Sequence, residues 1–173
     1  METFNAIASM LDIREYIDKP VSKDVKIQVL EAGRLTGSGS NQQHWRFLLV
    51  QTRDDLKKLA DASLYGKWIA NCNFAVIVLT DPKLPYHMID SGRSAQAMKL
   101  AAWEMGIVSG VFTATDKQAL RSYFEIPDEM DPTITVGFGY PKKITGKKKK
   151  RKSLSEVAFA DRYGHKFDQR EFL

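Results

Sequence analysis

The segment FAVIVLT at residues 74–80 limits the fold of this chain most strongly. Its apolar residues follow one another without polar alternation, so the pattern predicts a strand that is buried on both faces. Residues 91–105, SGRSAQAMKLAAWEM, are apolar around most of the helical circumference and are followed by Gly106. They predict a helix in the middle of the protein. Both elements therefore belong to the interior.

The remaining elements predict an α+β fold with a mainly antiparallel sheet, because helices and strands mix without regular βαβ spacing. Ser22 and Asp116 are typical residues to begin helices that run to about Leu35 and Phe124. The length of 173 residues fits one domain, 1–173. Further segments are expected as a helix start at 3–10, a β-rich run at 45–51, a helix at 53–62, a short buried segment at 106–112 and a strand at 133–139.

The positive charge is a local feature of the sequence. The run KKITGKKKKRK at residues 142–152, a basic loop within the domain, holds eight of the 26 basic residues, while 18 basic residues face 21 acidic ones elsewhere. The body is therefore not a polycation. No apolar run is long enough to cross a membrane, and the N-terminus lacks the pattern of a secretory signal. The single Cys72, amid apolar neighbours, is expected to be a buried thiol in a reducing, cytoplasmic compartment.

The segment GSGSNQQHWRFLLV at residues 37–50 changes from small polar residues to a strand-like run. Taken alone, its first half is a connector between a helix and a strand. Four segments together carry a more specific signal. They are MLDIREYIDKPVS, TGSGSNQQHWRFLLVQ, DSGRSAQAMKLAAWEMGIVSG and LRSYFEIPDEMDPTITVGFGYPKK.

In this order, over roughly residues 5–165, the four segments resemble the nitroreductase family of FMN-dependent NAD(P)H oxidoreductases. The resemblance implies an α+β sandwich that forms a domain-sharing homodimer with two FMN sites at its interface. It also implies hydride transfer from NAD(P)H through flavin N5 to an electron-poor acceptor such as a nitroaromatic compound or a quinone. No catalytic side chain is required, since the flavin carries the chemistry.

The resemblance implies that the loop before the β-rich run lies against the flavin. The family pattern Pro-Ser-x-x-Asn-x-Gln-Pro-Trp corresponds here to residues 37–45, with His44 in place of the second proline. Small residues let the backbone approach a cofactor, and polar side chains supply hydrogen bonds to the ribityl chain and the ring edge. His44 is expected as a polar lid or a surface residue. The candidates for flavin binding in this loop are Ser38, Ser40, Asn41 and Gln43.

The resemblance also assigns the charged part of the site. The family pattern Arg-Arg-Ser-x-Arg corresponds here to Met10–Arg14, so only Arg14 is retained and Asp12 replaces the serine. A backbone N–H of Ser109 or Gly110 is expected to face flavin N5. A C-terminal basic pair of the family grips the phosphate. Its counterparts here are Lys150, Arg151 and Lys152, whereas Lys147–Lys149 are expected in solvent.

Other functions remain open at this point. Relatives with this fold dehalogenate tyrosines or fragment the flavin. The basic run could also dock on nucleic acid or an acidic membrane if the flavin site has decayed, but it lacks interleaved aromatic residues, and neither partner is expected. The three histidines lack ligand-like spacing, so no metal site is expected. Trp45, Trp68 and Trp103 are expected in the core rather than stacked on a cofactor.

Overall fold

The four strands of the sheet pair in antiparallel fashion, which confirms the prediction of a mainly antiparallel sheet. A computed structural model describes residues 2–144, 149–168 and 170. Its four strands lie in the order β1-β2-β4-β3, and every neighbouring pair is antiparallel. The elements are α1 (Thr3–Ser9), α2 (Lys23–Arg34), η1 (Gly39–Asn41), β1 (Arg46–Val50), α3 (Arg53–Asp61), η2 (Lys67–Asn71), β2 (Phe74–Thr80), α4 (His87–Glu104), β3 (Val108–Phe112), α5 (Lys117–Phe124), β4 (Asp131–Gly139) and α6 (Leu154–Val157).

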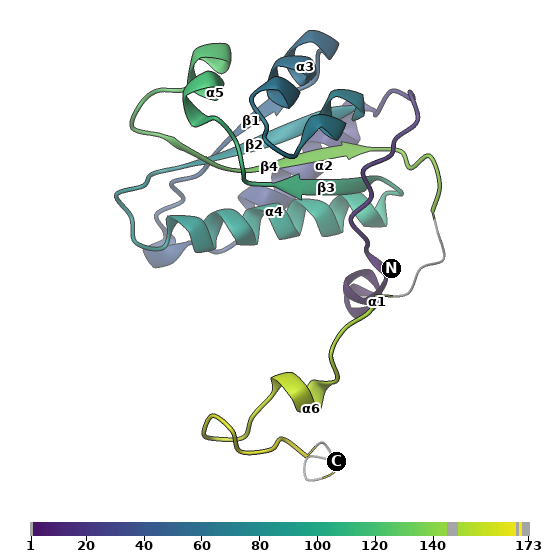
Figure 1. Ribbon diagram of the computed structural model, residues 1–173, viewed down its shortest axis with the longest axis vertical. Helices are drawn as coiled ribbons and strands as arrows, with labels where there is room; N and C mark the ends of the chain where they lie inside the picture. The colour runs from purple at the N-terminus through teal and green to yellow at the C-terminus, as the bar shows by residue number, and fades with distance from the viewer. Residues whose placement is uncertain (1, 145–148, 169, 171–173) are drawn as a thin grey trace.

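Strand β2 lies inside the sheet, and all seven of its residues are buried. Side chains alternate across a strand, so β2 serves two cores. Phe74 and Val76 pack with α2 and α4, whereas Ala75 and Ile77 pack with α3 and η2. Figure 1 shows α2 and α4 on one face of the sheet and α3 and α5 on the other. The prediction of a strand buried on both faces is confirmed.

Helix α4 packs against both the sheet and α2, as its nearly continuous apolar surface predicted. A Cβ atom on Gly33 would lie 2.2 Å from Met98 Cε, which shows how closely α2 approaches α4. The helix begins at His87, four residues earlier than predicted. Met88 and Ile89 of its first turn are exposed. The apolar residues of this turn therefore do not follow the pattern of a buried helix face, and the pattern did not predict this start.

The predicted helix starts are confirmed by hydrogen bonds. The Ser22 side chain accepts from the Val25 N–H at 3.3 Å, and Asp116 accepts from the Gln118 and Ala119 N–H groups at 3.0 Å. The expected short buried segment is β3, which follows Gly106 with its φ of +74°. Cys72 is fully buried, and burial raises the pKa of its thiol to about 12. It is the structural thiol that its neighbours predicted.

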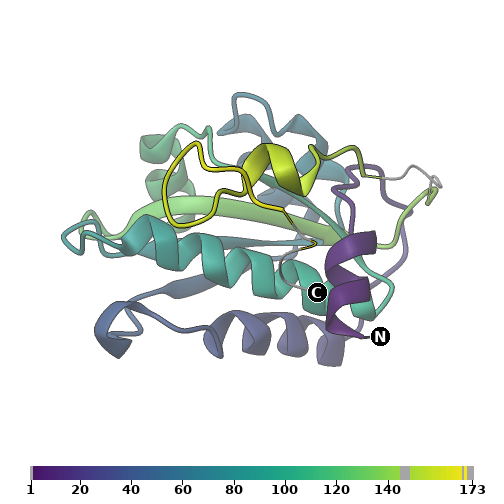
Figure 2. The ribbon, with the colours of Figure 1, turned by 90° about the horizontal axis from the view of Figure 1, so that it is seen from below.

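Helix α1, at the N-terminal end of the described chain, lies near the C-terminal end of α4 (Figure 1). Helix α1 is close to that end in both Figure 1 and Figure 2, and the segment that contains α6 leaves the body of the molecule. This C-terminal arm, residues 150–168, exposes large apolar side chains, among them Leu154, Val157 and Tyr163. Among the helices of the described residues, none has the length and apolarity that a membrane crossing requires.

The stacked pair Phe74 and Phe138 offers a test of this core. Their ring centroids lie 4.8 Å apart, and both residues are fully buried. We expect Phe74→Ala to lower the free energy of unfolding by about 3–5 kcal/mol, because it removes buried apolar surface and leaves a cavity. Urea unfolding at one fixed protein concentration measures this change. Leu64→Ala, at a residue that is 66% exposed, should change it by less than about 0.5 kcal/mol; equal effects would contradict this core.

Candidate functional site

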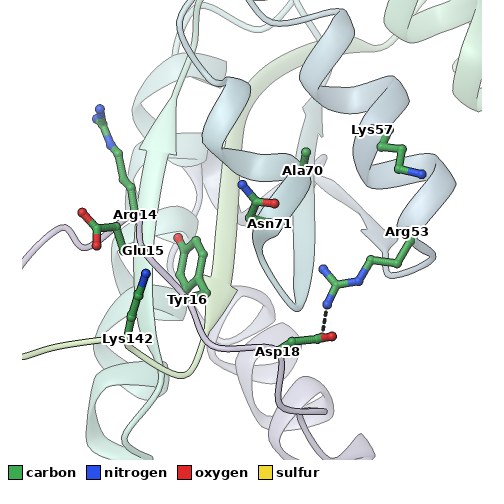
Figure 3. Close-up of a pocket in the computed structure, with 9 residues that line it drawn as sticks. All are labelled: Arg14, Glu15, Tyr16, Asp18, Arg53, Lys57, Ala70, Asn71 and Lys142. Carbon is green, nitrogen blue, oxygen red and sulfur yellow. Dashed lines mark hydrogen bonds and ion pairs between the residues drawn. The ribbon is translucent and has the colours of Figure 1, made fainter.

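A cavity of about 590 Å³ opens beside the segment that joins α1 to α2. Figure 3 shows how its lining residues lie, with Arg53 of α3 paired to Asp18. Four cationic side chains and two carboxylates line this cavity, so its charge is positive. The lining residues are Arg14, Glu15, Tyr16, Asp18, Arg53, Lys57, Ala70, Asn71 and Lys142.

Arg14 is held at this cavity by strand β3. Asp12 forms a parallel bridge with Ser109, and the Ile13 N–H donates to the Ser109 carbonyl at 3.0 Å. The Arg14 side chain packs directly against Gly110. A Cβ atom added to Gly110 would lie only 2.9 Å from Arg14 Cγ, so only glycine leaves room for this contact. The structure therefore brings together four residues that the sequence predicted for one site: Asp12, Arg14, Ser109 and Gly110.

Trp68 forms a further wall of this group. Arg14 Cζ lies 5.4 Å from the centroid of its ring, and an added Cβ atom on Gly110 would lie 2.8 Å from Trp68 Cη2. Its indole N–H is buried, and no residue that the structure describes accepts a hydrogen bond from it. A buried donor without a partner is uncommon. Trp68 packs on the core, as predicted, but it is also part of the candidate site.

Tyr16 and Gly110 lie beside the same residue of β4, Gly137. The Tyr16 hydroxyl donates to the Gly137 carbonyl at 3.3 Å, and Gly110 pairs with Gly137 across the sheet. Burial raises the pKa of Tyr16 far above its ordinary value, so this hydroxyl keeps its proton. Gly110 lies inside β3, paired with β4, rather than in an open turn. Whether Ser109 or Gly110 contacts a flavin stays a prediction.

The polar loop at residues 37–44 has a defined conformation. Ser40, Asn41 and Gln43 have φ angles of 49°, 55° and 49°, which are unusual for residues other than glycine. The Gln43 N–H donates to the Ser38 hydroxyl at 2.9 Å. Strained backbone of this kind persists where the surroundings enforce it, and it is frequent at ligand-binding segments. The loop is therefore a well-defined segment, and its contact with a flavin stays a prediction.

Asp90, in the first turn of α4, holds this loop in place. Its fully buried carboxylate accepts from the Gly39 N–H at 3.0 Å and contacts His44 Nε2 at 3.1 Å. The Asp81 N–H reaches His44 Nδ1 at 3.4 Å. The alternative that His44 is a surface residue is wrong, because its side chain is only 6% exposed. Whether it covers a flavin stays a prediction. Sequence reasoning missed Asp90; an acidic residue at the start of an otherwise apolar helix was the available signal.

The loop and the Arg14 group lie apart within one chain. The loop binds α4 at Asp90, whereas Asp12 binds it at Lys99 with a distance of 2.6 Å. Nine residues of helix place these contacts about 14 Å apart along the axis and on opposite sides of it. Figures 1 and 2 both show the loop after α2 and helix α1 at opposite ends of α4. One chain therefore does not join the two predicted halves of the site.

The basic run departs from the prediction at one residue. Lys150, Arg151 and Lys152 are exposed, and an Arg151 N–H donates to the Lys150 carbonyl at 2.8 Å. Lys149 was expected in solvent, but it is half-buried and its ammonium group contacts the Ile7 carbonyl. The same expectation for Lys147 and Lys148 concerns residues outside those that the structure describes. Binding of phosphate by Lys150–Lys152 stays a prediction.

Comparison with known proteins agrees with this geometry. The sequence pattern that defines the Nitroreductase family matches residues 8–70 and 64–140 of the chain. The chain belongs to the nitroreductase family. The resemblance inferred from the sequence is thereby confirmed, and so is the expectation of an enzyme of this family.

Individual relatives support the same assignment. A protein of Archaeoglobus fulgidus with the provisional name NADH dehydrogenase/NAD(P)H nitroreductase is 34% identical over 150 residues, which cover 82% of this chain and 86% of that one. A solved structure from Bacteroides thetaiotaomicron with the same provisional name has a TM-score of 0.87 at 27% identity and covers 94% and 99% of the two chains. A nitroreductase-like protein of Desulfovibrio desulfuricans, solved in complex with FMN, shares the fold with a TM-score of 0.79 at 22% identity over 94% and 98% of the chains.

The buried carboxylate of Asp90 provides a test of the loop. Asp90→Asn keeps the shape but removes the charge that Gly39 and His44 contact, and a hydrogen bond to a charged group is worth about 1.5–3 kcal/mol. We expect the amides of Gly39 and Gln43 to exchange with solvent deuterium about tenfold faster or more. The control Asp54→Asn, at a carboxylate that is 86% exposed, should leave both rates unchanged. Unchanged rates in Asp90→Asn would show that Asp90 does not hold the loop.

Proposed function

We propose that this nitroreductase-family protein binds FMN and passes hydride from NAD(P)H to an electron-poor acceptor, such as a nitroaromatic compound or a quinone. The observation that carries the proposal is the fixed position of Arg14. Strand β3 and Gly110 hold this guanidinium at the wall of a positively charged cavity, next to Trp68. A flavin ring gains negative charge on reduction, and a fixed cation stabilises that charge.

The residues of the cavity fit a flavin. Its volume of about 590 Å³ lies within the usual range of 300–1,000 Å³ for small-molecule sites. Asn71 offers both amide donors and a carbonyl acceptor for a ring edge, and the unpartnered indole N–H of Trp68 is a further donor nearby. The names of the relatives, NAD(P)H nitroreductase and, for a Bacillus subtilis protein, FMN reductase, agree with this cofactor.

We further propose that two chains form a homodimer that completes each site. The loop of Ser38–Gln43 and the Arg14 group lie at opposite ends of α4, so a second chain in antiparallel orientation would bring its loop to the Arg14 group of the first. Strand β1 is an edge strand, and α1 exposes 78% of Phe4 and 47% of Ile7. Exposed apolar surface and open strand edges favour association. The C-terminal arm offers further apolar surface for the same contact.

The chain's own groups would bind and orient rather than transfer protons. FMN supplies the hydride chemistry when it is bound. Arg14 holds positive charge at the ring, and Asn71 fixes the ring edge. Tyr16 remains neutral because burial raises its pKa, so it serves as a rigid wall of the cavity, hydrogen-bonded to the Gly137 carbonyl, and not as an acid. The lone buried Cys72 fits the cytoplasmic location expected from the sequence, which remains part of this proposal.

Arg14→Ala tests the cofactor assignment. The purified protein should show the absorption bands of a bound flavin, and the substitution should raise the dissociation constant for FMN by about 10- to 100-fold, since one charge-assisted contact is lost. Titration of the apoprotein with FMN, followed by flavin fluorescence, measures both constants. Arg34→Ala, on the exposed surface of α2, is the control and should bind FMN like the unmodified chain.

Two results would contradict the proposal. The cofactor assignment fails if saturating FMN gives neither bound absorbance nor a thermal shift. An FMN affinity that is equal in Arg14→Ala and in the unmodified protein would remove Arg14 from the site.

A further inference from the structure

Lys99 is a charged residue in the most enclosed helix of the protein. It lies on α4 between Met98 and Ala102, both of which are fully buried, and is itself only 7% exposed. A desolvated ammonium group is costly unless it has a partner. Its partner is Asp12, at 2.6 Å between Nζ and Oδ1. Asp12 lies two residues before Arg14 and on the same strand-like segment beside β3.

Two further cations lie close to this pair. Lys149 reaches α1, where it contacts the Ile7 carbonyl. The pKa of Lys149 is lowered, first by partial desolvation and then by the positive charges of Arg151 and Lys99, while Asp12 opposes the effect. Lys149 therefore lies within electrostatic reach of Lys99, Arg151 and Asp12, and these four groups together carry two positive charges in excess. Cations that repel one another at a common point favour the binding of an anion there.

The excess charge matches a phosphate monoester, which carries nearly two negative charges at neutral pH. We propose that Lys99, together with Lys149 and Arg151, binds the phosphate of FMN in place of the arginines that Met10 and Leu11 cannot supply. This inference rests on the proposed function. Asp12 neutralises the Lys99 ammonium before the phosphate binds, and its own negative charge opposes the phosphate.

Lys99→Met tests this inference with two ligands that differ only in the phosphate. Methionine keeps an unbranched apolar chain on the buried helix face and removes the charge. We expect the dissociation constant for FMN to rise by about 10- to 100-fold, while that for riboflavin changes by less than about threefold. Lys117→Met is a matched control, because Lys117 also pairs with an aspartate, Asp131, at 2.6 Å. It should change neither constant.

Asp12→Asn tests the same inference in the opposite direction. It removes the negative charge that opposes the phosphate, so FMN should bind more tightly while riboflavin binding stays unchanged. Its FMN affinity should also fall more steeply with added salt, because the cationic group then has a higher net charge. A mere structural ion pair would predict the reverse, namely that Asp12→Asn and Lys99→Met weaken FMN and riboflavin by the same factor. That result would overturn the inference.

The riboflavin measurements separate this inference from the proposed function. If the unmodified protein binds neither FMN nor riboflavin, the proposed function itself fails. If it binds both with the same affinity, the flavin site stands and the phosphate group is not recognised by these cations. If FMN is preferred and Lys99→Met retains the full preference, Lys99 is excluded from the phosphate site. Only a preference for FMN over riboflavin that is smaller in Lys99→Met than in the unmodified protein supports the inference.

Discussion

A charged side chain inside an apolar helix must find a partner, and α4 carries two such residues. Asp90 and Lys99 are both nearly inaccessible to solvent. Each draws a different segment onto the helix: Asp90 binds the loop through Gly39 and His44, and Lys99 binds the N-terminal segment through Asp12. A buried charge without any partner costs several kcal/mol, and Asp90 has a third partner in Arg93 of the same helix, at 3.4 Å. The central helix thereby fixes the positions of both halves of the candidate site.

The spacing of these two anchors is the reason that the proposed flavin site would need a second chain. They lie about 14 Å apart along α4 and on opposite sides of it, so one protomer presents two separate halves. A twofold axis places the same surface of each protomer against its partner, which gives two equivalent sites at once. In such a dimer, the exposed apolar residues of α1 and of the C-terminal arm would be contact surface. In this proposal, binding of the cofactor therefore depends on formation of the dimer.

The fold was largely predictable, and the site only in part. The continuous apolar run of β2 and the helix caps at Ser22 and Asp116 are local signals, and the structure confirms them. The gathering of Arg14 with Gly110 followed from the family resemblance. The burial of His44 and the ion pair of Asp12 with Lys99 did not, because each depends on contacts between segments that are far apart in the sequence. No periodicity or motif reports which charges a fold will bring together.

The most direct test of this account is sedimentation velocity of the purified protein, recorded at a wavelength where only the flavin absorbs. The account predicts that the colour sediments with a species of twice the 19.6-kDa chain mass. Colour that sediments with the single chain, or protein that sediments without any colour after incubation with excess FMN, would contradict a flavin site shared by two chains.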